Sequence, residues 1–372
     1  MKLTFAHMGH LYIPIGALFR HLGLEVVLPP PSSKRTLSLG CQNSPEFACL
    51  PLKVNVGNYI EAIERGADTI VMAGGIGPCR FGFYGEVERE ILQGLGYEFT
   101  MFIIDPPQGK IGPLLKQLGS LVGPVKPRDV IYALRLCWEK VTGIDRLNRL
   151  AVKVRPREVT RGETTRTMTD ILAEVDRAET IDATRAAVNR GLSRLAGIPQ
   201  RQDGPPPPRV GLVGEIYVVL EPFVNLEVET RLGELGCEVE RSIYLSDWIR
   251  RHVIGDIFRI LRPDPLLSLA RPYLGHFVGG HGLDTVAHTV EYARRGFDGV
   301  IQVMPFTCMP EIVAESILPR VSKELGIPVM TLVFDEHSSD VGVITRLEAF
   351  TDLIMQRRVR LGEIGECAVT SV

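Results

Sequence analysis

A strand–loop–helix pattern occurs twice in this sequence and constrains its fold more than any other feature. In each copy a helix ends at Arg-Gly, a buried strand follows, and one cysteine lies in the loop before the next helix. The first copy starts at Arg65 and carries Cys79, and the second starts at Arg295 and carries Cys308. Such alternation is typical of parallel sheets covered by helices. The sequence therefore predicts an α/β fold with two Rossmann-like lobes and parallel sheets.

The remaining elements follow from hydrophobic periodicity and turn residues. Strands are expected at residues 2–6, 25–28, 68–73, 99–105, 209–213, 238–243, 299–304 and 329–334. Helices are expected at residues 15–22, 52–65, 85–95, 220–235 and 311–325. Residues 114–195 have helical periodicity, many charges and few strand signals. They indicate a helical insertion in the first half of the chain, either a subdomain or an interaction arm.

The clearest domain boundary is Asp203-Gly204 followed by four prolines, because such a run forms a stiff, extended linker. A chain of 372 residues usually holds more than one core. The expected division is a first α/β lobe at 1–112, a helical subdomain at 113–202, the linker at 203–208 and a second α/β lobe at 209–372.

The charge balance and hydropathy exclude several classes of partner. The 42 basic and 44 acidic residues give a formal net charge of -2, which does not favour nucleic acid or an anionic membrane. No apolar stretch approaches the ~20 residues that a membrane span needs. The first residues also lack the apolar core of a signal peptide. We therefore expect a cytoplasmic protein whose thiols stay reduced.

The cysteines are the main candidates for chemistry. There are seven: Cys41, Cys49, Cys79, Cys137, Cys237, Cys308 and Cys367. An odd number in a reducing compartment argues against a disulfide framework and leaves core packing, catalysis or metal binding. We expect no special role for three of them: Cys137, Cys237 and Cys367.

Three of the others lie where a shared site could form. Cys79 and Cys308 each follow a buried strand, and ligands of open α/β sheets bind at the carboxyl ends of the strands. Cys49 lies close to the start of another helix. Since thiolates bind iron–sulfur clusters and zinc, one interpretation is a cluster held by these three, with Cys41 as a candidate fourth ligand. The other interpretation is ordinary buried cysteines.

Polar residues at the strand ends of the second lobe are further candidates. Glu215 ends the first strand, where a carboxylate could orient substrate or transfer a proton, or could instead cap a helix or form a salt bridge. His337 follows the last strand and is a candidate proton shuttle or part of a solvated turn. Glu336 beside it is a candidate for substrate binding.

Two glycine turns are also candidates for substrate binding. Gly74 and Gly75 lie in GGIG, which lacks the Lys-Ser/Thr of a phosphate loop. A close approach of the backbone to a cluster accounts for these glycines better than phosphate binding does. Gly280 and His281 form a similar turn before a helix.

Long motifs in both lobes resemble a known family. They are SPEFACLPLKVNVGNYIEA, MAGGIGPCRFGFYGEVEREIL, VGEIYV, PFTCMPEIVAESILPRVSKELGIPVMTLVFDEH and TRLEAFTDL. Together they resemble the activase-related branch of the 2-hydroxyacyl-CoA dehydratase family. The resemblance is weakest across residues 114–195.

The resemblance implies two Rossmann-like lobes with a [4Fe–4S] cluster in the cleft, held here by Cys49, Cys79 and Cys308. It implies a separate partner, an ATP-dependent activator with an actin-like fold, which supplies one electron in an anaerobic system. In the dehydratases this electron makes a ketyl radical from a CoA thioester and permits loss of the hydroxyl group. Dehydratases work as pairs of related subunits, so a homodimer or a related subunit is a further expected partner.

Three functions stay open at this point. The first is an enzyme that reduces or dehydrates a small substrate, such as a CoA thioester. The second is a non-catalytic electron-transfer or cluster-carrying accessory protein. The third is a metal-free protein that binds a small molecule, and the matched cysteine loops argue against it.

Overall fold

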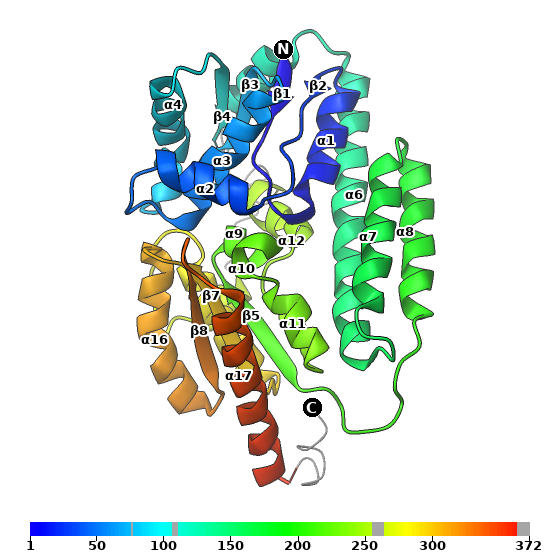
Figure 1. Cartoon of the computed structure of the whole chain (residues 1–372), viewed down its shortest axis with the longest axis vertical. Helices are drawn as coiled ribbons and strands as arrows, with labels where there is room; N and C mark the ends of the chain where they lie inside the picture. The colour runs from blue at the N-terminus through cyan, green and yellow to red at the C-terminus, as the bar shows by residue number, and fades with distance from the viewer. Residues whose placement is uncertain (76, 106–110, 255–263, 363–372) are drawn as a thin grey trace.

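Two four-stranded parallel sheets form the centres of two lobes (Figure 1). The computed structural model describes residues 1–75, 77–105, 111–254 and 264–362. The strand order is β2-β1-β3-β4 in the first lobe and β6-β5-β7-β8 in the second, so the two sheets share one topology. The predicted α/β class with two Rossmann-like lobes is confirmed.

The first lobe contains one helix that the sequence pattern did not predict. Its strands are β1 (Lys2–Thr4), β2 (Glu25–Val26), β3 (Thr69–Ala73) and β4 (Thr100–Ile104). Its helices are α1 (Tyr12–His21), α2 (Lys34–Asn43), α3 (Leu50–Glu64) and α4 (Tyr84–Gly94). The unexpected helix is α2, which begins directly after a proline run. It begins there because Ser33 and Thr36 form a capping box.

In the second lobe, the prediction of a single helix over residues 220–235 is wrong, because this region contains separate short helices. The strands are β5 (Arg209–Gly214), β6 (Glu238–Arg241), β7 (Gly299–Pro305) and β8 (Val329–Phe334). The helices include α9 (Ile216–Leu220), α10 (Pro222–Asn225), α11 (Val228–Glu234), α12 (Leu245–Ile249), α14 (Pro265–Ser268), α15 (Gly282–Arg294), α16 (Met309–Leu325) and α17 (Asp340–Arg360). Leu226 and Glu227 take left-handed conformations, with φ of 54° and 60°, and separate α10 from α11.

An aspartate joins each repeated strand to its neighbour in the same way. Asp68, just before β3, accepts the N–H of Lys2 at 2.7 Å. Asp298, just before β7, accepts the N–H of Arg209 at 2.7 Å. The two lobes therefore share this local contact as well as their strand order.

The predicted helical insertion is present and shares its core with α1 of the first lobe. Its helices are α6 (Pro127–Val154), α7 (Glu163–Arg177) and α8 (Ile181–Ala196). The preceding helix, α5 (Ile111–Val122), packs through Leu121 into the core of the first lobe. The core formed by α6, α7 and α8 also includes Ile13 of α1, and Figure 1 shows these helices beside α1. The fully buried Lys140 donates to the carbonyls of Val175 and Asp176 at 2.6 and 3.0 Å, at the end of α7.

Helix α3 lies where the two lobes meet. All its residues from Leu50 to Ala62 are buried. Leu50 and Val54 belong to the hydrophobic core that also contains β5, β7 and β8 of the second lobe. The start of α3, which follows Cys49, is therefore held by both lobes. In the described parts of the chain, no helix combines the length and the apolar character needed to cross a membrane.

Candidate functional site

The three cysteines predicted to share a site occupy the same local position. Cys49 is the N-cap of α3, Cys308 is the N-cap of α16, and Cys79 is the N-cap of a short 3-10 helix, Arg80–Phe83. A proline in the first turn helps to start both α3 and α16. The N-terminus of a helix carries a positive partial charge, which favours a thiolate over a thiol.

Burial opposes this effect. Cys49 and Cys308 are 8% and 7% exposed. Burial raises the pKa of Cys49 to about 11 and also raises the pKa values of Cys79 and Cys308. The hydroxyl of Tyr84, which contacts the Cys49 sulfur, and the N–H of Leu52 act in the opposite direction on Cys49. In the absence of a metal these thiols keep their protons, and metal binding must displace them.

One carboxylate acts on all three thiols. Burial has the largest effect on these groups, and Glu215 also raises the pKa of each one, which places it within electrostatic range of all three. Burial raises the pKa of Glu215 itself to about 7. Its side chain accepts the N–H of Val218 at 3.0 Å, so it caps α9 as well. Cysteines from both lobes therefore lie within electrostatic range of this half-buried carboxyl group.

A second acid that acts on a cysteine, Glu311, is fully buried and was not identified from the sequence. It is 0% exposed, its two oxygens accept the Thr285 hydroxyl at 3.1 and 3.0 Å, and the Gln302 amide donates to it at 2.8 Å. Burial raises its pKa to about 8. The available signal was its position three residues after Cys308, which is the spacing of a capping box.

Two other residues near the cysteines were missed. Tyr84 begins α4, is buried, and places its hydroxyl on the Cys49 sulfur. Arg80 directly follows Cys79 and reaches the second lobe at Thr307. Neither residue type is a metal ligand in ordinary sequence patterns, so no local signal pointed to them.

Cys41, the candidate fourth ligand, has different surroundings. Burial raises its pKa, Glu336 raises it further, and Lys53 lowers it. Lys53 and Glu336 themselves form an ion pair of 2.6 Å between the lobes. The carboxylate of Glu336, a predicted substrate-binding residue, is therefore paired with a lysine. Cys41 lies within electrostatic range of this ion pair.

His337 and the two glycine turns have mainly structural surroundings. His337 is exposed, and its N–H donates to the Asp335 carboxylate at 2.9 Å in a turn. A Cβ on Gly74 or Gly75 would collide with side chains of the same lobe. His281 begins α15, and burial lowers its pKa to about 4, so its ring is neutral at physiological pH.

Gly280 is the exception among these residues because it reaches the cysteines. A Cβ built on it would lie 3.8 Å from the Cys79 sulfur and 3.1 Å from Cγ of Pro310. The turn of the second lobe thus lies against a cysteine of the first lobe. A side chain at this position would press on Pro310 and contact the Cys79 sulfur.

The other cysteines have ordinary environments. Cys237 is 0% exposed and belongs to the hydrophobic core of the second lobe. Burial raises the pKa of Cys137 to about 12. Cys367 lies outside the described residues.

Within the described ranges, no group of three or more His, Cys, Asp or Glu side chains is already arranged to hold a metal ion. The donor chemistry is nevertheless of the kind that an iron–sulfur cluster takes, because Cys49, Cys79 and Cys308 supply three thiols from helix N-termini, all within electrostatic range of Glu215.

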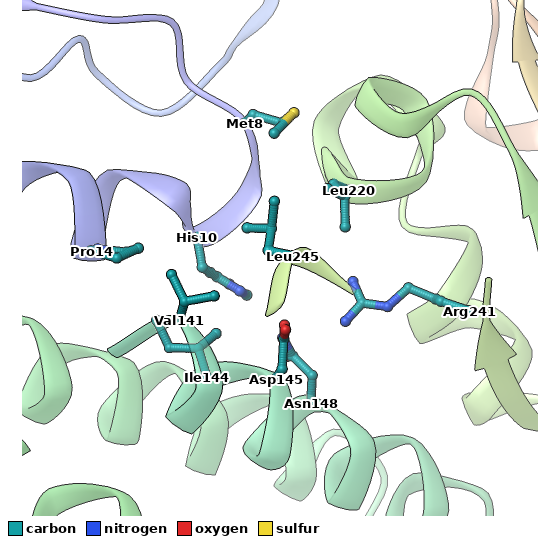
Figure 2. Close-up of a pocket in the computed structure, with 10 residues that line it drawn as sticks. All are labelled: Met8, His10, Pro14, Val141, Ile144, Asp145, Asn148, Leu220, Arg241 and Leu245. Atoms are coloured by element: carbon teal, nitrogen blue, oxygen red, sulfur yellow. The ribbon is translucent and has the colours of Figure 1, made fainter. Parts of the chain in front are cut away.

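A small cavity lies away from these cysteines, between α6 and the two lobes (Figure 2). It is lined by Met8, His10, Pro14, Val141, Ile144, Asp145, Asn148, Leu220, Arg241 and Leu245. Figure 2 shows the rings and head groups of His10, Asp145 and Arg241 directed into it. Its volume of about 20 Å³ suits a single water molecule. Burial and Arg241 lower the pKa of His10 to about 4, so the imidazole is neutral.

A larger cavity of about 240 Å³ is lined by residues of α1, α6 and the end of α7. Arg20, His21, Lys140, Asp176 and Glu179 contribute its polar lining. Both signs of charge are present, and Lys140 already binds two carbonyls. This lining identifies no particular ligand.

Residues 6–73 match the family model described as a CoA enzyme activase uncharacterised domain. The match supports a link between the first lobe and CoA enzyme activase proteins. It agrees with the resemblance seen in the motifs at the level of the family and does not identify a branch within it. It includes Cys41 and Cys49 but ends before Cys79. No curated protein matches the chain.

Proposed function

We propose that this chain binds a [4Fe–4S] cluster through Cys49, Cys79 and Cys308 and accepts electrons within a CoA enzyme activase or dehydratase system. The observation that supports this most is the common position of the three cysteines. Each is a helix N-cap, they come from both lobes, and Glu215 acts on all of them.

The residues around the thiols have distinct roles in this proposal. A bound cluster would take up and release single electrons. The helix N-termini favour the ligating thiolates, and Gly280 lets the turn of the second lobe approach Cys79 without a side chain between them. Glu215 and Glu311 can take up and release protons close to the site near neutral pH, because burial raises their pKa values to about 7 and 8. The fourth iron would be open to hydroxide, substrate or Cys41.

The proposed electron donor is a separate ATP-dependent activator with an actin-like fold. Exposed aromatic side chains flank the cysteines in sequence: Phe47 is 73% exposed, Phe83 is 72% and Phe306 is 60%. Contiguous exposed apolar patches mark contacts with other proteins, and we assign these three side chains to such a contact. The family match to a CoA enzyme activase domain agrees with a role in a multi-protein system.

Anaerobic purification with iron and sulfide analysis tests the cluster. We expect about four iron and four sulfide ions per chain, as a [4Fe–4S] cluster requires. Cys49→Ser, Cys79→Ser and Cys308→Ser should each lower the bound iron, whereas the control Cys137→Ser should not. A wild-type chain without iron and sulfide after reconstitution would refute the proposal.

A second measurement separates the enzyme from an accessory protein. If the protein is an enzyme, a CoA thioester that reaches the open iron should change the electron paramagnetic resonance spectrum of the reduced protein. An unchanged spectrum across a panel of 2-hydroxyacyl-CoA thioesters favours the non-catalytic electron-transfer or cluster-carrying role. Tight ATP binding by the chain alone, measured by calorimetry, would argue against a separate ATP-dependent activator.

A further inference from the structure

We propose that Arg80 is a positioning residue that ties the three cysteine loops into one site across the two lobes. The inference rests on the proposed cluster for its functional meaning. The contacts that carry it belong to the polypeptide alone, so they can be tested with and without metal.

The guanidinium of Arg80 contacts chain next to each of the other two cysteines. Its Nη1 donates to the carbonyl of Phe47 at 3.1 Å, two residues before Cys49. Its Nη2 donates to the carbonyl and the hydroxyl of Thr307 at 2.5 and 2.8 Å, directly before the second-lobe cysteine. Arg80 itself follows the third cysteine. One side chain therefore joins all three loops.

Thr307 links two of the cysteine loops directly, and its strained backbone needs support from neighbouring contacts. Its hydroxyl lies 3.3 Å from the carbonyl of Phe47, so the two loops also touch directly. The φ of Thr307 is +66°, a left-handed conformation that a β-branched residue rarely takes. Such a conformation persists only where surrounding contacts hold it. Two of these contacts come from Arg80.

The geometry suits arginine better than a lysine that keeps the same positive charge. Within the described residues, Arg80 forms no ion pair, and its donors are directed at neutral carbonyl and hydroxyl oxygens. A guanidinium offers donors on two separate nitrogens in a planar fork, whereas a lysine ammonium is a compact point. Lysine would keep the charge near Cys49 and Cys79 but would have one nitrogen in place of the two that bind Phe47 and Thr307 separately.

Iron release tests this role in the loaded protein. Arg80→Met and Arg80→Lys should both transfer iron to a chelator about tenfold faster than wild type, because both lose hydrogen bonds between the loops. Both should also change the resonance spectrum of the reduced cluster. The control Arg89→Met removes a partly exposed arginine that pairs with Glu86 in α4 and should behave as wild type. Wild-type release rates and spectra in Arg80→Lys would overturn the bridging role.

Hydrogen exchange in the metal-free protein separates this inference from the cluster proposal. Arg80→Met should speed amide exchange at residues 45–49 and 305–309, and Thr307→Val should do so more than Thr307→Ser. If wild type binds no cluster but Arg80→Met shows this change, the cluster proposal fails and the positioning role stands. If wild type binds a cluster and Arg80→Met alters neither exchange nor iron release, the positioning role is overturned and the cluster stands.

Discussion

The ammonium of Lys53 lies 2.6 Å from the carboxylate of Glu336 and forms a direct link between the two lobes. The two partners are buried to different degrees, with the Lys53 side chain 3% exposed and that of Glu336 24% exposed. Glu336 can regain water if the pair is broken, but Lys53 cannot. Loss of the ion pair should therefore cost more free energy when Lys53 is the partner left behind than when Glu336 is.

This asymmetry predicts unequal effects of removing each partner. Glu336→Gln should lower the free energy of unfolding by about 3 kcal/mol, because it leaves a buried charge without its partner. Lys53→Met should cost less, about 1 kcal/mol, because it removes the buried charge and leaves a solvated carboxylate. Denaturant unfolding at pH 7 measures both values. Equal losses would show that Lys53 reaches water in solution.

Gly40 permits the close contact between α2 and α3. A Cβ at this position would overlap the carbonyl oxygen of Lys53. Gly40→Ala should therefore destabilise the protein by about 2 kcal/mol, since backbone must move to relieve the overlap. The control is Gly94→Ala in α4, where no atom lies within 4 Å of the added carbon. It should stabilise the protein by about 0.5 kcal/mol, and a loss as large as that of Gly40→Ala would contradict the packing argument.

Glu88 should make stability depend on pH. It is 0% exposed, and burial raises its pKa well above the ordinary value of 4.5, with only the Asn55 amide opposing this. Above pH 4.5 the unfolded chain ionises at this position while the folded chain keeps its proton, so the unfolded state binds fewer protons and folded stability falls as pH rises. Glu88→Gln removes this penalty.

The stability of Glu88→Gln relative to wild type should therefore increase between pH 4.5 and pH 8. Urea unfolding of both proteins at several pH values measures the difference. A difference that stays constant with pH would mean that Glu88 is ionised in the folded protein.

Tyr84 should tune the potential of the proposed cluster. Its hydroxyl contacts the Cys49 sulfur. Reduction adds negative charge, which a hydrogen-bond donor to the sulfur stabilises, so Tyr84→Phe should shift the midpoint potential to a more negative value. The control is Tyr59→Phe, because this buried hydroxyl has no hydrogen-bond partner within the described residues. Redox titration followed by electron paramagnetic resonance measures both, and equal shifts would rule out a specific effect of Tyr84.

The sequence by itself determined the α/β class and the repeated unit, because these depend on short-range rules. Gly66 and Gly296 end equivalent helices with φ of +95° and +70°, conformations that favour glycine. Asp68 and Asp298 then bind the first residue of the neighbouring strand in both lobes. Each of these signals lies within a few residues of the structure it specifies. The three N-cap cysteines follow from the same local patterns.

Only the tertiary structure decided what surrounds these cysteines. Arg80 and Thr307 are 227 residues apart in sequence, and no spacing rule connects them. Glu215 acts on cysteines of both lobes only because α3 packs into the core of the second lobe. The burial of Glu311 likewise depends on Thr285 and Gln302 from other elements. Contacts of this kind depend on how finished elements pack together, and periodicity along the chain carries no information about that packing.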